Sequence, residues 1–268
     1  MDATTLEKDN KIIVQELSET GAQYGFSRSR RHPTTGPFIY AVKNRVEIID
    51  LEKSADLLIK ACAFVRSVAE KREQILFSGN KLEARDAVYS VAERLEQPHA
   101  KERWLGGTIT NWSELKKRVG RLVDLTQKRE AGELGKYTKK ERVVIDREIA
   151  HLERFFGGLL AMKQVPGALF VVDPREEHTA VAEARALKIP VVALAGTDCD
   201  VSLIDYPILA NDTSRKTITY VLSAIADAYK SGLEATPKGS AGIITPEGVA
   251  TLAGEPSAEE PSGAEFGI

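Results

Sequence analysis

The run Ala168-Leu169-Phe170-Val171-Val172 decides the fold class, because it contains only apolar residues and stops at Asp173-Pro174. A short, continuous apolar run of this kind indicates a strand buried on both faces, as in a parallel sheet covered by helices. Val191-Val192-Ala193-Leu194-Ala195 repeats the pattern after a helical segment at residues 177–187. Two buried strands joined by a helix predict an α/β fold with a parallel sheet.

The alternation of strand and helix extends in both directions from this unit. Residues 74–77 form another apolar run, which the polar turn Ser78-Gly79-Asn80 follows. This turn has one glycine and lacks the spacing of a nucleotide-binding loop, so we interpret it as an ordinary strand-to-helix turn. Further strands are expected at 37–42, 46–49 and 205–210, and further helices at 5–19, 50–68, 81–95 and 215–233.

Two long polar helices, at residues 112–130 and 138–156, interrupt this alternation. Each carries a narrow apolar stripe on a largely charged surface, which is typical of an antiparallel coiled coil of two helices. Thr138 and Glu141 have the spacing of a capping box at the start of the second helix. Bases outnumber acids on the hairpin, so it could contact RNA or proteins, or serve only as a solubilised arm.

These elements predict four parts of the chain. We expect an N-terminal helix within residues 1–20, and an α/β domain made of two stretches, 21–111 and 157–234. The coiled-coil hairpin at 112–156 is inserted between those two stretches. Residues 235–268 are rich in Gly, Pro, Ser, Ala and Glu, and this composition predicts a disordered acidic tail.

The loop before the first long helix reads Arg103-Trp104-Leu105-Gly106-Gly107-Thr108-Ile109-Thr110-Asn111-Trp112 and holds both tryptophans of the chain. Asn111 is expected to cap that helix with its side chain. Lys101, Arg103, Lys116 and Lys117 surround the aromatic pair, which suggests a docking corner. The alternative is that both tryptophans are buried anchors that fix where the helices leave the domain.

A second basic region lies near the start of the chain. Residues 21–46 contain five bases and no acid, in a chain whose net charge is -2. The bases are Arg28, Arg30, Arg31, Lys43 and Arg45. A polyanionic partner is the simplest cause of such a bias, and a solvated basic loop is the alternative.

The bulk properties of the 268 residues describe a globular protein. Cys62 and Cys199 are far apart, without metal-type spacing, which favours a reducing compartment over a disulfide scaffold. No signal peptide and no apolar run of membrane-spanning length is visible. We therefore expect a cytoplasmic protein without a membrane partner.

Catalytic chemistry would have to lie at the carboxyl ends of the strands, where open α/β sheets bind ligands. Asp173, Asp198 and Asp200 follow strands there and could ligate a divalent metal with a phosphate, but they are also common turn formers and helix caps. Cys199 lies between two acids, which would raise its pKa and disfavour a nucleophile. The four histidines are scattered in the sequence. We predict no catalytic set, no metal site and no cofactor.

Four stretches of the chain resemble the bacterial ribosomal protein S2 family. They occur in the family's order and lie within residues 17–232. They are Gly21-Ala22-Gln23-Tyr24-Gly25, then Pro37-Phe38-Ile39-Tyr40 with the following 44–53, then the tryptophan loop at 103–112, and finally 166–173 with His178, Glu183 and Ile189-Pro190-Val191.

The resemblance implies a flavodoxin-like, Rossmann-like parallel sheet with an inserted coiled-coil hairpin, and a structural role without catalysis. Its implied partners are small-subunit rRNA and neighbouring ribosomal proteins, including the large mRNA-binding protein one of that subunit. Contacts with structured RNA are expected to be directed mainly at phosphates and shape. The residues expected to bind RNA are Arg28, Arg30, Arg31, Lys43, Arg45, Lys101, Arg103, Trp104, Asn111, Trp112, Lys116 and Lys117.

The chain also departs from the family pattern. Gln23 and Phe26 stand where family members carry histidines, and Arg31 replaces an aromatic residue. Thr34 and Gly36 replace lysines. Two other functions stay open on the residues alone: a cytosolic α/β enzyme that handles a phosphorylated small molecule at the Ser78 and Asp198 turns, and a free coiled-coil adaptor.

Overall fold

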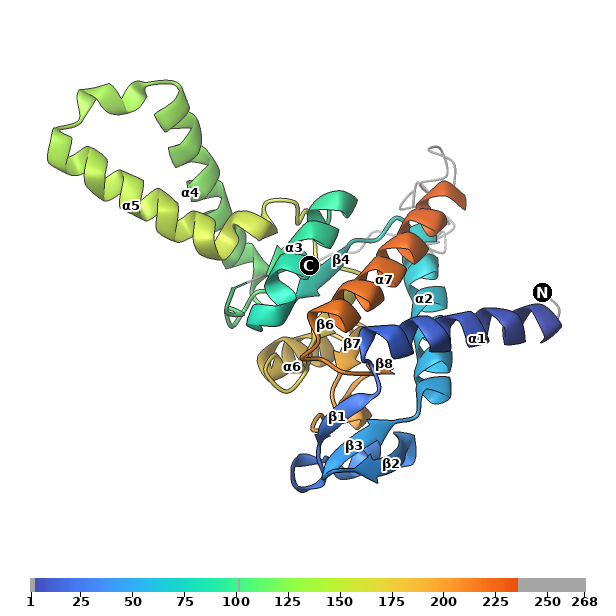
Figure 1. Cartoon of the computed structure of the whole chain (residues 1–268). Helices are drawn as coiled ribbons and strands as arrows, with labels where there is room; N and C mark the ends of the chain where they lie inside the picture. Colours follow the sequence, from blue (N-terminus) through green and yellow to red (C-terminus); the bar gives the residue numbers. More distant parts are fainter. Residues whose placement is uncertain (1–2, 101, 236–268) are drawn as a thin grey trace, which may run out of the picture.

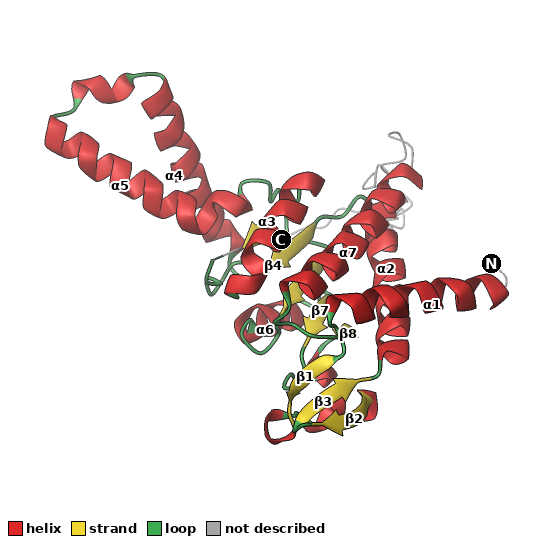
Figure 2. Ribbon diagram, in the orientation of Figure 1, coloured by secondary structure: helices red, strands yellow, loops and turns green. Residues whose placement is uncertain are grey.

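A computed structural model describes residues 3–100 and 102–235 of the chain. Its centre is a five-stranded parallel sheet with the strand order β5-β4-β6-β7-β8. Helices flank the sheet (Figures 1 and 2), so the predicted α/β class is confirmed and the fold is Rossmann-like. The strands are β4 (Ile75–Ser78), β5 (His99–Ala100), β6 (Ala168–Val172), β7 (Val191–Ala195) and β8 (Tyr206–Leu209).

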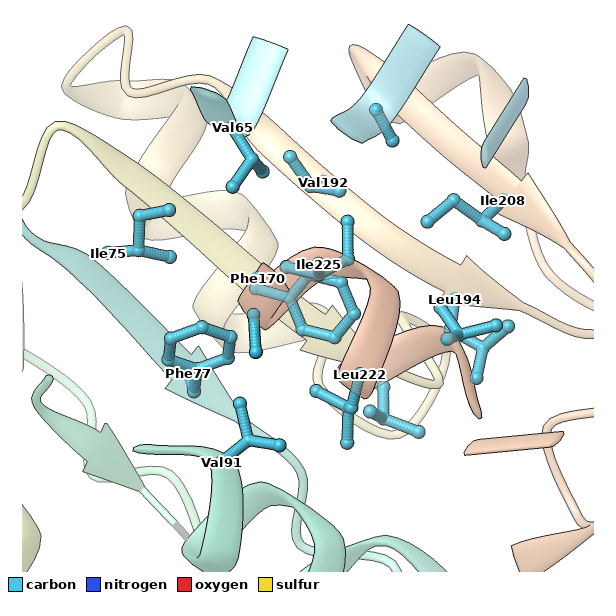
Figure 3. Close-up of a cluster of buried hydrophobic side chains, with 14 of the residues drawn as sticks. Val65, Ile75, Phe77, Val91, Phe170, Val192, Leu194, Ile208, Leu222 and Ile225 are labelled. Carbon is cyan, nitrogen blue, oxygen red and sulfur yellow. The ribbon is translucent and has the colours of Figure 1, made fainter. Parts of the chain in front are cut away.

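Both faces of the sheet are buried, which explains its unbroken apolar runs. Phe77, Phe170 and Leu194 face one helical layer, and Figure 3 shows part of this cluster. That layer contains α2 (Leu51–Glu70), α3 (Leu82–Leu95) and α7 (Arg215–Ala235). Leu169 and Val171 face the opposite cluster, to which α6 (His178–Ala186) contributes. Each fully buried side chain of this size stabilises the fold by about 1.5–3 kcal/mol.

The ends of the chain pack differently from the centre. The helix expected at the N-terminus is present as α1 (Ala3–Thr20), and its Leu17 belongs to the core shared with α2 and α7. The predicted tail at 235–268 lies outside the described residues, apart from Ala235, which ends α7.

A second, smaller sheet contains β1 (Tyr24–Ser27), β2 (Ile39–Lys43) and β3 (Val46–Ile49), in the antiparallel order β1-β3-β2. Asn44 and Arg45 join β2 to β3 with φ angles of 51° and 66°, as two-residue hairpin turns require. The hairpin was predicted, but β1 was not. The two 3-10 helices η1 (Arg28–Arg30) and η2 (Pro33–Phe38) connect β1 to β2. The strand predicted to begin at residue 37 is therefore wrong at its start, because Pro37 and Phe38 close η2 instead.

Two helices, α4 (Trp112–Glu130) and α5 (Lys139–Phe156), project from the body as a hairpin, with η3 (Glu133–Lys136) in the turn between them (Figure 1). Near the body the apolar seam is closed, since Leu122 and Ile149 are buried. Leu125 and Leu134 are also buried, whereas Val144 on α5 is 57% exposed. The capping box of Thr138 and Glu141 is present as predicted.

The capping role predicted for Asn111 is wrong in its chemistry. Asn111 occupies the N-cap position of α4, but its side chain makes no capping hydrogen bond. Its φ and ψ of -128° and 41° differ from the extended backbone that usually aims a capping side chain at the first turn. The start of α4 is held instead by backbone bonds, from Asn111 N to Gly107 O (2.8 Å) and from Leu115 N to Asn111 O (3.3 Å).

The base of the helical hairpin packs directly against the edge strand β5. The short helix η4 (Gly157–Leu159) returns the chain from α5 to the body. A Cβ atom at Gly158 would lie 2.2 Å from the carbonyl oxygen of His99. Only glycine permits this approach, so Gly158 fixes the place where the hairpin meets the sheet.

Candidate functional site

The strand order places a topological switch between β4 and β6, because the chain proceeds from β4 to β5 on one side and then crosses to β6 on the other. Open α/β sheets bind ligands outside the carboxyl ends of the strands at such a point. The turn after β4 and the turns that begin at Asp173 and Gly196 meet this edge of the sheet. Their side chains decide whether the edge is free to bind a substrate.

A buried ionic cluster fills part of this edge. Lys81 Nζ lies 3.0 Å from Asp173 Oδ2 and 2.9 Å from Asp212 Oδ2. Burial alone would lower the pKa of Lys81, but the bond to Asp212 and the charges of both acids hold it above its usual value. Burial and the charge of Asp173 raise the pKa of Asp212 to about 6. The half-buried Lys81 thus neutralises two buried aspartates, which buried carboxylates require.

The small sheet covers the neighbouring turn after β7. Phe26 N donates a hydrogen bond to Thr197 Oγ1 (2.9 Å), and Thr35 Oγ1 donates one to Thr197 O (2.9 Å). The Phe26 ring lies so close to Gly196 that a Cβ atom there would meet it at 3.0 Å. Phe26, one of the two departures from family histidines, thus closes this turn with an apolar ring. The other, Gln23, is partly buried, and its Oε1 has no hydrogen-bond partner in the described residues.

The acids proposed as possible metal ligands have other partners. Asp198 accepts hydrogen bonds from Arg175 and Arg30, and Asp200 caps η5 (Val201–Leu203) by accepting from Ser202 N (3.0 Å). Asp173 accepts from Arg175 N as well as from Lys81. Across residues 3–100 and 102–235, no group of three His, Cys, Asp or Glu side chains is arranged to hold a metal ion. The geometry favours the turn-forming interpretation of these acids.

Cys199 cannot act as a nucleophile in this setting. Its side chain is fully buried, and its Sγ lies 3.6 Å from Asp173 Oδ1. Burial, followed by the charges of Asp173, Asp198 and Asp212, raises the pKa of the thiol far above its usual value. The direction agrees with the expectation, but burial contributes most, and of the two flanking acids only Asp198 contributes; a raised pKa disfavours the thiolate form that a nucleophile needs.

A single carboxylate, Glu183 of α6, organises the tryptophan loop. It accepts hydrogen bonds from Trp104 Nε1 (3.1 Å), Gly107 N (2.7 Å), Ile109 N (3.1 Å) and both N and Oγ1 of Thr110 (3.2 and 3.1 Å). Burial would raise the pKa of Glu183, but these donors hold it below its usual value. The sequence indicated Glu183 only as part of a family motif, and nothing local identified its partners.

The two tryptophans are buried. Trp104 is 6% exposed and Trp112 is 8% exposed. Their burial favours the interpretation as anchors over stacking on an external partner. Contact of these two residues and of Asn111 with RNA stays a prediction.

The predicted RNA-binding cations occupy two separate surfaces. Arg28, Lys43 and Arg45 are exposed on the small sheet and its connections, and make no ion pair within the described residues. Arg31 instead pairs with the buried Glu47 (3.3 Å), and Arg30 pairs with Asp198 (3.4 Å). Three cations are exposed around the base of the helical hairpin, namely Arg103, Lys116 and Lys117, the last of which pairs with Glu114 (2.7 Å). Lys101 lies outside the described residues.

The fold and this site define a structural α/β protein. Its own lysine, aspartates and phenylalanine occupy much of the edge where a related enzyme would bind its substrate, and its unpaired cations face outward. The family model described as Ribosomal protein S2 matches residues 17–232. The chain belongs to the ribosomal protein S2 family.

Individual relatives agree with this assignment. The chain is 41% identical to small ribosomal subunit protein uS2c of Rhodomonas salina over 221 residues, which cover 82% of this chain and 91% of that protein. It is 40% identical to uS2 of Chloroflexus aggregans over 222 residues (83% and 93%), and 43% identical to uS2 of Spiroplasma citri over 219 residues (82% and 61%). The resemblance is confirmed, and because this is a family of structural ribosomal proteins, the enzyme hypothesis is excluded. No helix in the described residues is both long enough and apolar enough to cross a bilayer.

Proposed function

We propose that this protein is a structural constituent of the small ribosomal subunit in the cytoplasm, and that it binds small-subunit rRNA with its outward cations. Membership of the ribosomal protein S2 family supports the first part of the proposal. The protein takes part in translation by holding neighbouring RNA and ribosomal proteins in place, without catalysis. Among those neighbours we include the large mRNA-binding protein one of the subunit.

The observation that carries the RNA-binding part is that some cations of residues 28–45 form ion pairs within the protein and others do not. Two acids that contact this region, Glu47 and Asp198, are already paired with Arg31, Arg30 and Arg175. Arg28, Lys43 and Arg45 are left without an acidic partner in the described chain. A surface with unpaired bases and neutralised acids attracts a polyanion, and each phosphate contact releases bound counterions.

We assign the second RNA-binding surface to Arg103, Lys116 and Lys117 at the base of the hairpin. The buried tryptophans serve this surface indirectly, because they and Glu183 hold the loop that presents Arg103. We therefore assign an indirect role in RNA binding to Trp104, Trp112 and Asn111, which position the loop and its cations.

We further propose that the sheet is flavodoxin-like. Numbering its five strands along the chain gives the order 2-1-3-4-5, which is the flavodoxin order. The hairpin at 112–156 is proposed to be an antiparallel coiled coil inserted into a domain formed by 21–111 and 157–234, with a separate N-terminal helix in 1–20. The closed seam of Leu115, Val119, Leu122, Ile149 and Leu152 supports the coiled coil.

Co-sedimentation in a sucrose gradient tests the function. The wild-type chain is expected in the small-subunit peak, and a protein found only at the top of the gradient would contradict the proposal. Changing Arg28, Lys43 and Arg45 together to Glu is expected to abolish incorporation, since three phosphate contacts become repulsive.

A matched control reverses three exposed lysines on α2, α7 and the turn after α2, namely Lys60, Lys216 and Lys71. This control changes the net charge by the same amount and is expected to enter the subunit normally. Equal loss of both variants would show that total charge matters and not the surface proposed here.

A further inference from the structure

The small sheet leaves one side of the switch point open. A pocket of about 700 Å³ lies there, next to the carboxyl ends of β4, β5 and β6. Its wall includes Asn80, Arg85, Arg103, Arg154, Glu177 and His178. This is the position at which Rossmann-like folds accept ligands, and neither the ionic cluster of Lys81 nor the Phe26 ring lines it.

Three arginines from three different elements converge on the pocket. Arg154 Nη2 lies 3.4 Å from Glu102 Oε2, and Arg85 Nη1 lies 3.8 Å from the same oxygen. Arg85 Nε also donates to Asn80 O (2.7 Å), which orients its guanidinium. Arg103 is exposed and has no ion pair within the described chain. Since each guanidinium carries five donors, one shared carboxylate leaves most of them unused.

A buried carboxyl group completes the wall. Glu177 is 1% exposed, and its Oε1 accepts a hydrogen bond from Asn80 N (3.0 Å). The buried Ser78 hydroxyl lies close enough to this carboxyl group to lower its pKa, although the two groups do not meet the geometry of a full hydrogen bond. Burial raises the pKa of Glu177 to about 7. The Ser78 hydroxyl is the neighbouring donor for this carboxyl group, and a carboxylate oxygen can accept from a second donor as well.

We infer that this pocket binds a single nucleotide, with its phosphate at Arg103, Arg85 and Arg154 and the edge of its base at Glu177. Arginine matches phosphate oxygens with paired donors, and a carboxylate accepts from the exocyclic amine of adenine, cytosine or guanine. The inference rests on the proposed RNA-binding function. The nucleotide is either an unstacked residue of the rRNA or a free nucleotide.

A purely structural role for the arginines explains only part of the arrangement. Glu102 holds Arg85 of α3 and Arg154 of α5 together, so this ion pair fastens the base of the hairpin to the body. That role involves neither Arg103 nor Glu177. A bound nucleotide would contact both.

Calorimetric titration of the full chain with the four nucleoside 5′-monophosphates, and with inorganic phosphate, tests the free-nucleotide source. Arg103→Ala is expected to weaken binding roughly tenfold, as the loss of one charge-assisted contact does. The control is Arg94→Ala, which lies on α3 with Arg85 but pairs with Asp227 outside the pocket, and it is expected to bind normally. Above about pH 8, where Glu177 is ionised, Glu177→Gln is expected to reduce the preference for amino-bearing bases over uracil.

Ultraviolet cross-linking of intact small subunits, followed by mass spectrometry, tests the rRNA source. A cross-linked nucleotide on the peptides that contain Arg103 or His178 is expected, and Arg103→Ala is expected to reduce its yield per molecule of co-sedimenting protein. A cross-link with binding of free nucleotides absent would assign the pocket to an rRNA nucleotide.

Two outcomes would overturn the inference without touching the proposed function. One is normal co-sedimentation with neither nucleotide binding nor a cross-link at these peptides. The other is a cross-link from the pocket to a neighbouring protein, which would make it a site for an acidic peptide. Loss of co-sedimentation by the wild-type chain would instead count against the proposed function itself.

Discussion

The ionic cluster beneath the small sheet and the cations on that sheet use similar side chains in opposite ways. Lys81 is placed between two aspartates and has little contact with water. Arg28, Lys43 and Arg45 are exposed and have no acidic partner in the described residues. A charge left alone in the interior costs several kcal/mol, whereas water solvates an exposed charge at almost no cost.

This difference predicts that the buried charges contribute to the stability of the fold and that the exposed charges contribute to binding of partners. Removing a charge from the buried cluster should lower the free energy of unfolding, and removing one from the outer surface should change only binding. Each of the changes below is expected to fall clearly on one side of that division, and together they run from the largest effect to the smallest.

Lys81→Met is expected to have the largest effect on stability. It would leave Asp173 and Asp212 facing each other without a cation, at a cost of about 3–5 kcal/mol in the free energy of unfolding. Urea denaturation measures this change. Adding Asp212→Asn to the variant should recover part of the loss, because it removes one of the two repelling carboxylates. A loss below about 1 kcal/mol for Lys81→Met would show that the cluster is wetter than its geometry indicates.

Glu183→Ala is expected to destabilise the protein by about 3 kcal/mol, because several donors of the tryptophan loop lose their acceptor. Thermal unfolding gives the size of the effect. The tryptophan fluorescence should also shift to longer wavelength as Trp104 becomes hydrated. Glu153→Ala, an exposed substitution on α5, serves as the control and should alter neither signal.

Glu177→Gln is expected to change how stability depends on pH. The pKa of Glu177 is raised to about 7 in the folded protein, so between about pH 4.5 and 7 the folded state holds a proton that the unfolded state has released. Wild-type stability therefore falls as the pH rises through this window. The glutamine variant should match the wild type near pH 5 and exceed it by on the order of 2 kcal/mol near pH 8. If the stability of both proteins changed with pH in the same way, the raised pKa of Glu177 would be refuted.

Lys43→Ala is expected to have the smallest effect on the protein itself, with stability unchanged within about 0.5 kcal/mol. Its binding to small-subunit rRNA should weaken, and the slope of log affinity against log salt should become shallower by about one. Filter binding at several salt concentrations measures both quantities. If stability fell and the salt slope did not change, Lys43 would stabilise the fold and would not contact RNA.

The sequence predicts those elements of the fold that residues close together in the chain determine. The runs at β6 and β7 are apolar because both faces are buried, and the Thr138–Glu141 spacing is sufficient to close a capping box. In contrast, β5 has two residues, and β1 is held through pairing with β3 and a bond from Phe26 to Thr197. Such short strands depend on distant neighbours and leave no periodic pattern.

The site was less predictable than the fold for the same reason. Lys81 is 92 residues from Asp173 and 131 from Asp212, so nothing near it in the sequence indicates that it pairs with two buried aspartates. Arg31 and Arg28 are equivalent in sequence, yet only Arg31 reaches the buried Glu47. The acid-free composition of residues 21–46 suggested an RNA-binding surface, but it could not separate the cations that form ion pairs within the fold from those that stay unpaired in the described residues.

The bond from Phe26 to Thr197 spans 171 residues, and this separation has a consequence for synthesis. A nascent chain emerges from its N-terminus, so the segment with the early cations leaves the exit tunnel long before the residue that anchors it. Until residues 191–212 follow, β1 has no Thr197 to hold it and Phe26 has no turn to cover. The surface that we propose to bind rRNA is therefore among the last parts of the protein to fold. A truncated product that ends before Thr197 would lack it.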